Sequence, residues 1–172
     1  MFSLNKNQEL TKFISYSECS GLNIEGDGDV SGLFGNGNPV KSNEGDPEII
    51  INIKFKVKVN ITHILIESSK IDENSFPEKL KIFTNCSNLD FADAEENSGT
   101  ETFNLNNENL GKKISVKIPK FKNISELCLF FVNEDANYIK INSIRFYGSL
   151  GEVNIDFGEM KKNPVTWGRG KC

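Results

Sequence analysis

Histidine and tryptophan are nearly absent from this chain of 172 residues, which has one of each. A single histidine, His63, cannot supply the sets of His and Cys ligands that zinc sites use. Any Ser-His-Asp or Cys-His catalytic device would also have to include it. His63 lies between Thr62 and Ile64 in an expected strand, which favours a packed or edge-strand role. We therefore expect no catalytic residue, no metal and no cofactor, and the chain is not predicted to be an enzyme.

Closely spaced cysteines are also missing. The four cysteines, Cys19, Cys86, Cys128 and Cys172, form no C-x-x-C pair. A reducing compartment disfavours disulfides between them. Cys128 lies in an apolar run and is predicted to be a small core residue, whereas Cys86 follows an expected strand and is predicted to be exposed.

The sequence has no apolar run near the roughly 20 residues of a membrane span, and its first residues lack the apolar region of a secretory signal. We expect a cytoplasmic protein, with the nucleus as a second compartment, and no membrane partner. The sequons at Asn60, Asn85 and Asn123 would then carry no glycan. A net charge of −4 argues against nucleic-acid binding by bulk electrostatics and leaves a local basic patch open.

The chain does contain strong period-two patterning. Every odd position from Ile49 to Ile61 is apolar, and every even position except Ile50 is polar. This alternation predicts a strand with one buried and one wet face. Thirteen residues are long for one strand, so we expect a bend near Lys54–Lys58.

Shorter strands are expected further along the chain, and the run at 126–132, apolar on both faces, is expected to be central. Many short strands separated by turns predict an all-β antiparallel sandwich or jelly roll. A weak helical pattern covers 8–14, and a helical turn is expected at 90–95. The other strands are expected at residues 63–67, 79–84, 102–105, 114–118 and 139–147.

Two acidic loops are candidate sites. Asp27, Asp29 and Ser31 follow the spacing of a calcium loop, but Asn38 replaces the required Glu at position twelve, so a flexible acidic loop is favoured. The second loop lies at 90–96. Its carboxylates are adjacent in one turn rather than facing each other across a cleft, which favours a solvated surface that a basic partner could recognise over a glycosidase pair. Its acidic residues are Asp90, Asp93, Glu95 and Glu96.

Read in order, these segments resemble the PITH domain, named for proteasome-interacting thioredoxins. The most specific part is Pro-Glu-Lys-Leu-Lys-Ile-Phe-Thr-Asn at 77–85 followed by Leu-Asp-Phe-Ala-Asp-Ala-Glu at 89–95. The other matching segments are the acidic opening at 42–55, Val-Lys-Val at 57–59, Phe-Asn-Leu at 103–105, Lys-Phe-Lys-Asn-Ile-Ser-Glu-Leu at 120–127 and Ile-Asn-Ser-Ile-Arg-Phe-Tyr-Gly at 141–148.

The resemblance implies a jelly-roll β-sandwich that is galactose-binding-like and similar to the Doc subunit of the anaphase-promoting complex. It places an N-terminal extension at 1–18, the domain at 19–162 and a tail at 163–172. The best-known members carry a thioredoxin domain with a C-x-x-C motif. This chain has no such motif, so no redox activity is expected.

The leading hypothesis from the resemblance is a monomeric, non-catalytic interaction module that docks on subunits of the 26S proteasome regulatory particle. One candidate surface is the acidic turn, and the other is the tail with Trp167, Arg169 and Cys172. The Cys172 thiolate and terminal carboxylate could ligate a partner's metal. The alternative is that the tail packs on its own domain. The alternative function is binding of a glycan or other small ligand, with Phe34, Phe76 and Phe91 as stacking candidates.

Overall fold

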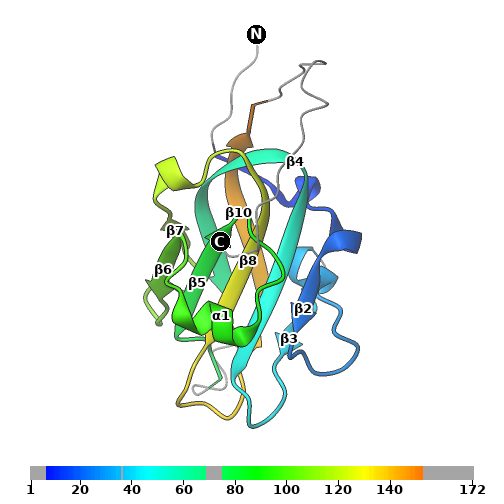
Figure 1. Cartoon of the computed structure of the whole chain (residues 1–172), viewed down its shortest axis with the longest axis vertical. Coiled ribbons are helices and arrows are strands. Elements are labelled where there is room, and N and C mark those ends of the chain that lie inside the picture. Colours follow the sequence, from blue (N-terminus) through cyan, green and yellow to red (C-terminus); the bar gives the residue numbers. More distant parts are fainter. Residues whose placement is uncertain (1–6, 36, 69–74, 153–172) are drawn as a thin grey trace.

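Two layers of antiparallel strands pack face to face in the computed structural model, which describes residues 7–35, 37–68 and 75–152 (Figure 1). The first layer contains, in spatial order, β2 (Ser20–Leu22), the first part of β4 (Glu48–Glu67), β8 (Ile124–Val132), β5 (Lys79–Thr84) and β6 (Glu101–Asn104). The second contains β1 (Gln8–Glu9), β10 (Ser143–Leu150), the second part of β4 and β7 (Lys113–Ser115). The antiparallel jelly-roll sandwich predicted from the sequence is confirmed.

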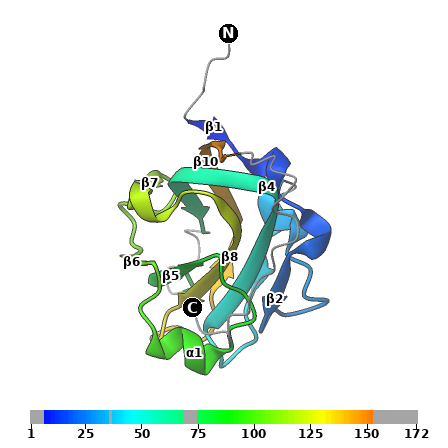
Figure 2. The same cartoon turned by 45° about the horizontal axis from the view of Figure 1, so that its top comes forward.

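The strand β4 belongs to both layers because it bends in the middle. Its residues 48–54 pair with β8, whereas His63–Glu67 pair with β10. The register with β8 shifts between Lys54 and Val59, so the bend falls where the sequence predicted it. The strand arches over one end of the sandwich there (Figure 2). The bend turns Val57 into solvent and interrupts the predicted alternation at that residue.

The main hydrophobic core lies between the two layers. Ile49, Ile51 and Ile53 of β4 are fully buried there, as the alternation predicted. Burying a side chain of this size stabilises the fold by about 1.5–3 kcal/mol. The strand β8 is central, between β4 and β5, and is buried on both faces because a second cluster covers its outer face.

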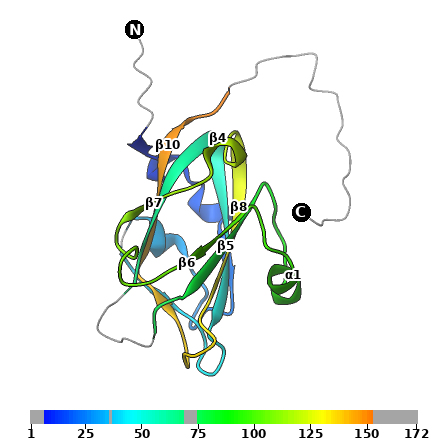
Figure 3. The same ribbon diagram turned by 90° about the vertical axis from the view of Figure 1, so that its left-hand side faces the viewer.

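Short elements close the rest of the sandwich. A two-stranded sheet joins β3 (Val40–Lys41) to β9 (Lys140–Ile141), and one α-helix, α1 (Phe91–Glu96), lies outside the first layer (Figure 3). The 3-10 helices are η1 (Thr11–Phe13), η2 (Tyr16–Glu18), η3 (Ser31–Phe34) and η4 (Ile118–Lys120). None of the helices in the described ranges is long and apolar enough to cross a membrane.

The segment before residue 19 packs on the sandwich over its described part. The strand β1 pairs with β10, and Leu10 and Ile14 are fully buried in the main core. The weak helical pattern at 8–14 was wrong as a prediction of an α-helix, because this segment forms β1 and η1 instead. Pairing with the edge of β10 and burial of two apolar side chains outweigh a local helical preference.

The prediction for 114–118 was wrong in one respect. The strand β7 ends at Ser115, and Ile118 begins η4 with its side chain exposed. Pro119 follows directly, and a proline lacks the N–H that a continuing strand would donate. The alternation of Ile114, Val116 and Ile118 therefore continues in the sequence beyond the end of the strand.

Candidate functional site

The acidic turn forms the short helix α1, as the sequence predicted. Asp90 is its N-cap, and its Oδ1 accepts a hydrogen bond of 2.8 Å from the backbone N–H of Asp93. Asp90, Glu95 and Glu96 are exposed, Asp93 is half-buried, and Ala94 faces the domain and is buried. An isolated helix of six residues is unstable in water, so tertiary contacts must hold α1 in place.

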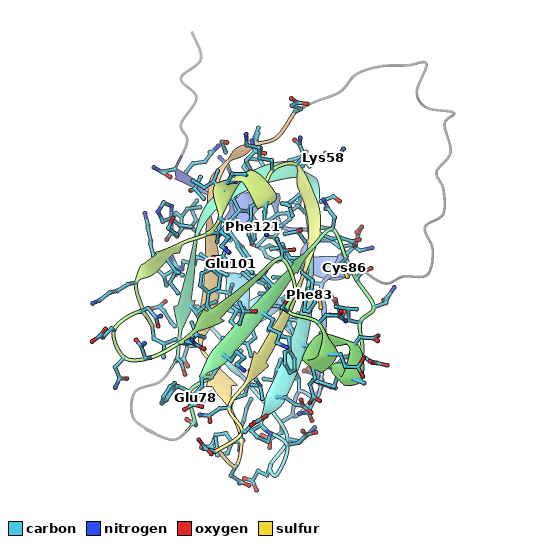
Figure 4. The ribbon with its side chains drawn as sticks, turned by 60° about the vertical axis from the view of Figure 1, so that its left-hand side comes forward. Lys58, Glu78, Phe83, Cys86, Glu101 and Phe121 are labelled. Atoms are coloured by element: carbon cyan, nitrogen blue, oxygen red, sulfur yellow. The ribbon has the colours of Figure 1, made fainter. Side chains whose placement is uncertain are left out.

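A second hydrophobic cluster provides those contacts on the outer face of the first layer. Phe91 packs edge-on against Phe130 of β8, with ring centroids 6.1 Å apart. Figure 4 shows Phe83 and Cys86 beside α1. The buried members of the cluster are Ile50, Phe83, Cys86, Leu89, Ala94, Cys128 and Phe130.

The prediction that Cys86 is exposed was wrong, because its side chain is 3% exposed within this cluster. Cys86 is also disulfide-bonded, which corrects the expectation that disulfides are disfavoured in this chain. The predicted burial of Cys128 is confirmed, and burial raises the pKa of its thiol to about 12. Cys19 is half-buried, and burial likewise raises the pKa of its thiol. A thiol with a raised pKa is a poor nucleophile at neutral pH, so neither Cys19 nor Cys128 has the character of a catalytic cysteine.

The C-terminal end of α1 is fixed by Lys81 of β5. Its Nζ donates to the carbonyl oxygens of Ala94, Glu95 and Asn97 at 2.9, 2.9 and 3.0 Å. A cation at this position satisfies carbonyls that a helix end leaves without partners, and it complements the helix dipole. Partial burial lowers the pKa of the Lys81 ammonium, helped by nearby Lys79, while Glu95 acts in the opposite direction.

The segment before α1 is tied to β8 by asparagine side chains. Asn85 has a positive φ of 50°, and its Oδ1 accepts hydrogen bonds from the backbone N–H and the hydroxyl of Ser125. Its Nδ2 donates to the carbonyl of Asn123, whose own N–H donates to Asn60 Oδ1. The Oδ1 of Asn123 accepts a hydrogen bond from the N–H of Glu152, so the side chains of all three sequon asparagines form hydrogen bonds within the fold.

The structure places further carboxylates beside Glu95 that the sequence analysis missed. A cavity of about 240 Å³ is lined by Glu95 together with Asp46, which precedes β4, Glu48, which begins it, and Glu134, which follows the end of β8. Glu48 pairs with Val132 across the two strands, which brings Glu134 to this end of the sheet. This grouping of carboxylates could have been predicted from the sequence only by assuming that β4 and β8 are antiparallel neighbours.

Crowding of carboxylates changes the protonation of Glu48. Burial raises the pKa of its carboxyl group to about 7, and the negative charges of Asp46 and Glu95 add to the shift. We name the surface formed by Asp46, Glu48, Asp90, Asp93, Glu95, Glu96 and Glu134 the acidic face. It combines the predicted acidic turn with the carboxylates at the ends of β4 and β8.

Two other cavities have polar residues in their lining. One of about 290 Å³ is lined by residues including Glu78, Lys79 and Asn104, and one of about 430 Å³ lies between the end of β5 and the loop at 97–100. Over residues 7–35, 37–68 and 75–152, no three His, Cys, Asp or Glu side chains converge in a way that could hold a metal ion.

The other candidates from the sequence lie apart from the acidic face. His63 is half-buried in β4, and its Nδ1 lies 3.0 Å from the hydroxyl of Thr62. In the loop considered for calcium, Asp27 and Asp29 each accept a hydrogen bond from a backbone N–H two residues ahead. These carboxylates therefore stabilise local turns.

The aromatic stacking candidates pack against the domain. Phe34 is buried and stacks on Tyr16 with centroids 6.1 Å apart, and Phe76 is partly buried against the main core. Phe91 is partly buried in the cluster beneath α1. Trp167, Arg169 and Cys172 lie outside the described residues.

The architecture defines the class of fold. A family 32 CBM from C. perfringens NanJ, solved in complex with galactose, superposes with a TM-score of 0.59 at 11% identity, over 82% of this chain and 98% of that one. The C-terminal domain of a chitobiase from Bacteroides fragilis superposes with a TM-score of 0.58 at 15% identity, over 84% and 100%. The chain therefore has a galactose-binding-like β-sandwich fold.

Within that class the chain belongs to the PITH domain family, whose model matches residues 2–164. It is 38% identical to PITH domain-containing protein 1 of Dictyostelium discoideum over 87 residues, covering 50% of this chain and 42% of that protein. It is 29% identical to PITH domain-containing protein 1 of Homo sapiens over 126 residues, covering 72% and 54%. The matches span about half the length of these relatives. The family resemblance read from the sequence is confirmed.

Proposed function

We propose that this chain is a non-catalytic interaction module that docks on the regulatory particle of the 26S proteasome through the acidic face. Membership of a family named for proteasome-interacting thioredoxins supports the proteasome as the binding partner. One observation supports the acidic face as the docking surface. The helix α1 presents its carboxylates from a position fixed by Lys81, Phe91 and Asp90. A preorganised surface loses little conformational entropy when it binds.

The acidic face would bind a basic surface on the partner. Complementary charges speed association and select the partner more than they add affinity. Glu95 and Glu96 are the most suitable residues to mutate because both are exposed and neither caps the helix. Asp90 differs, because its side chain holds the first turn of α1.

The test is binding of the purified protein to purified 26S proteasome, followed on native gels. Glu95→Lys/Glu96→Lys should weaken binding about tenfold or more, with a steeper effect at low salt. Glu18→Lys/Glu108→Lys makes the same charge change at exposed positions away from the acidic face and should leave binding unchanged. Asp90→Ser keeps a capping side chain while removing one charge. Equal binding by the two double variants would exclude the acidic face, and no binding by the wild type would exclude the docking function.

The tail is a second docking candidate, with Trp167 and Arg169 as anchors and Cys172 as a ligand for a metal in the partner. Truncation after Lys162 combined with Glu95→Lys/Glu96→Lys separates the two surfaces. If both contribute independently, the two losses in binding free energy should add. Cys172→Ser tests this ligand role, because it should reduce binding if the sulfur contacts a metal in the partner.

Ligand binding is the second candidate function. It is favoured by the shared fold of this chain and a domain solved in complex with galactose. Similarity at 11% identity extends to the fold and not to a sugar site. A glycan array with protection of the loops around Phe76 and Phe91 would support it, whereas an array without hits would count against it.

A further inference from the structure

Carboxylates predominate at one end of the sandwich and lysines at the other. The acidic face lies where β4 begins and β8 ends, and Figure 4 shows Glu78 at this same end. Lys58 lies at the opposite end, at the arch of β4 (Figure 4). The lysines gathered there are Lys56 and Lys58 on the arch and Lys120 and Lys122 on the segment that leads into β8. We call this surface the lysine end.

Hydrogen bonds hold these segments side by side. The N–H of Ile61 donates to the carbonyl of Phe121 at 2.9 Å, and the N–H of Gly151 donates to the carbonyl of Lys58 at 2.7 Å. Asn123, next to Lys122, receives the N–H of Glu152 on its Oδ1 and donates its own N–H to Asn60. The arch, the segment 118–123 and the end of β10 therefore form one rigid surface.

The lysines of this end are exposed and make no ion pair with another described residue. The ion pairs within residues 7–35, 37–68 and 75–152 involve Lys41 and Arg145 instead. Glu152 is the nearest carboxylate in sequence to the end of β10, and Glu126 lies across from Lys54 at the margin. The net charge at the lysine end is positive, although the whole chain has a formal net charge of −4.

Exposed aliphatic side chains occur at the same end. Val57, Ile118 and Leu150 are 44%, 42% and 45% exposed, and they account for three of the five exposed large hydrophobic residues described. Val57 lies between Lys56 and Lys58, Ile118 precedes Lys120, and Leu150 pairs with Val59 beside the arch. These side chains lie on or beside the arch of β4, and the three cavities described above are lined by other residues.

We propose that the lysine end binds the surface of an anionic phospholipid membrane. Lysines attract acidic headgroups, and aliphatic side chains among them gain free energy by entering the boundary between headgroups and acyl chains. Lysines with aliphatic neighbours suit lipid better than nucleic acid, whose binding sites favour arginine and aromatic side chains. A bound peptide usually lies in a groove or along an open sheet edge, and none of the three cavities described above is lined by these residues.

This contact would be peripheral. The expectation of no membrane partner was based on the lack of a spanning segment, and a surface that lies on a membrane needs none. The acidic face, at the far end of the sandwich, would be repelled by the same headgroups and would point into solution. Binding of lipid and binding of a protein at the acidic face would therefore be compatible.

The test is flotation of the full chain with vesicles of phosphatidylcholine, with and without phosphatidylserine. We expect binding only to the vesicles that contain phosphatidylserine, and weaker binding at high salt. Lys56→Glu/Lys58→Glu should lower the partition coefficient about tenfold or more. Lys79→Glu/Lys112→Glu makes the same charge change away from the lysine end and should have little effect.

A second pair of variants tests the aliphatic contribution. Val57→Ser/Leu150→Ser should weaken vesicle binding, whereas Leu22→Ser, at a residue 42% exposed on β2, should not. Thermal unfolding checks that each variant is folded. Absence of wild-type binding to phosphatidylserine vesicles would overturn the proposal. Equal binding of the two lysine variants, or binding to single-stranded RNA or an acidic peptide but not to vesicles, would also overturn it.

Discussion

The ammonium group of Lys81 lies 2.9 Å from the carbonyl oxygen of Ala94, and this contact joins the middle of β5 to the end of α1. Lys81→Met keeps the aliphatic stem and removes all three hydrogen bonds to the helix. Because hydrogen bonds to charged groups contribute about 1.5–3 kcal/mol, we expect a loss of about 2 kcal/mol in the free energy of unfolding. Urea denaturation measures it, and hydrogen exchange should show faster exchange in α1.

Lys79→Met is the matched control, since Lys79 lies two residues earlier on the same strand and is exposed. It should change stability by less than about 0.5 kcal/mol. Equal losses for the two variants would mean that Lys81 contributes through general surface charge and does not hold α1.

The pKa of Glu48, raised to about 7 in the folded protein from an ordinary value of 4.5, predicts pH-dependent stability. A carboxyl whose folded pKa is raised binds more protons in the folded state between these values. Its contribution is present below pH 4.5 and is lost as the pH rises through 7. Because solvent screens this partly exposed group, we expect a loss of about 1 kcal/mol.

Glu48→Gln removes the titration. Thermal unfolding at pH 5 and pH 8 should show that the variant is stabilised relative to the wild type at pH 8 and differs little at pH 5. Glu108→Gln, at an exposed carboxylate away from the acidic face, should show no such pH dependence. A stabilisation of Glu48→Gln that is equal at both pH values would contradict the assignment.

Asn123 combines a positive φ of 54° with hydrogen bonds to two other segments. Asn123→Ala introduces left-handed strain and loses the side-chain acceptor, so we expect a loss of about 2 kcal/mol. Asn123→Gly removes only the acceptor and should cost about 1 kcal/mol. Asn88→Ala is the control for strain alone, because Asn88 has a φ of 61° and is exposed. If Asn88→Ala cost as much as Asn123→Ala, in urea titrations, the side-chain contacts would contribute nothing.

Gly148 lies at the shift in register between β10 and β4. A Cβ atom there would overlap the backbone carbonyl of Asn60, which cannot move without breaking the arch. Gly148→Ala should therefore destabilise the fold by about 3 kcal/mol or more. Gly35→Ala, where a Cβ meets nothing within 4 Å, should be nearly neutral in the same thermal unfolding measurement. A mild effect at Gly148 would show that the arch is deformable.

The strands were predictable because burial on one face leaves a period-two pattern, and the bend of β4 was predictable because Ile49–Ile61 is too long for one flat strand. The helical turn at 90–95 was also predicted, and in the structure Asp90 caps α1. What sequence reasoning missed depends on pairing between distant segments. Glu48 and Glu134 become neighbours of Glu95 only through the register of β4 with β8. Cys86 is buried in a cluster whose other members include residues of β4, β5, β8 and α1, so its burial also depends on contacts between distant segments.

The passage of β4 from one layer to the other has a consequence for synthesis on the ribosome. The first part of β4 cannot pair with β8, nor the second part with β10, until these later strands have been synthesised, and β10 ends at Leu150. Pairings between residues so far apart in sequence form slowly, because a long loop must be closed before any contact compensates for it. Until the last strand emerges, the nascent chain exposes the twenty residues of β4, whose odd positions from Ile49 to Ile61 are all apolar. This is the kind of segment that chaperones protect from aggregation.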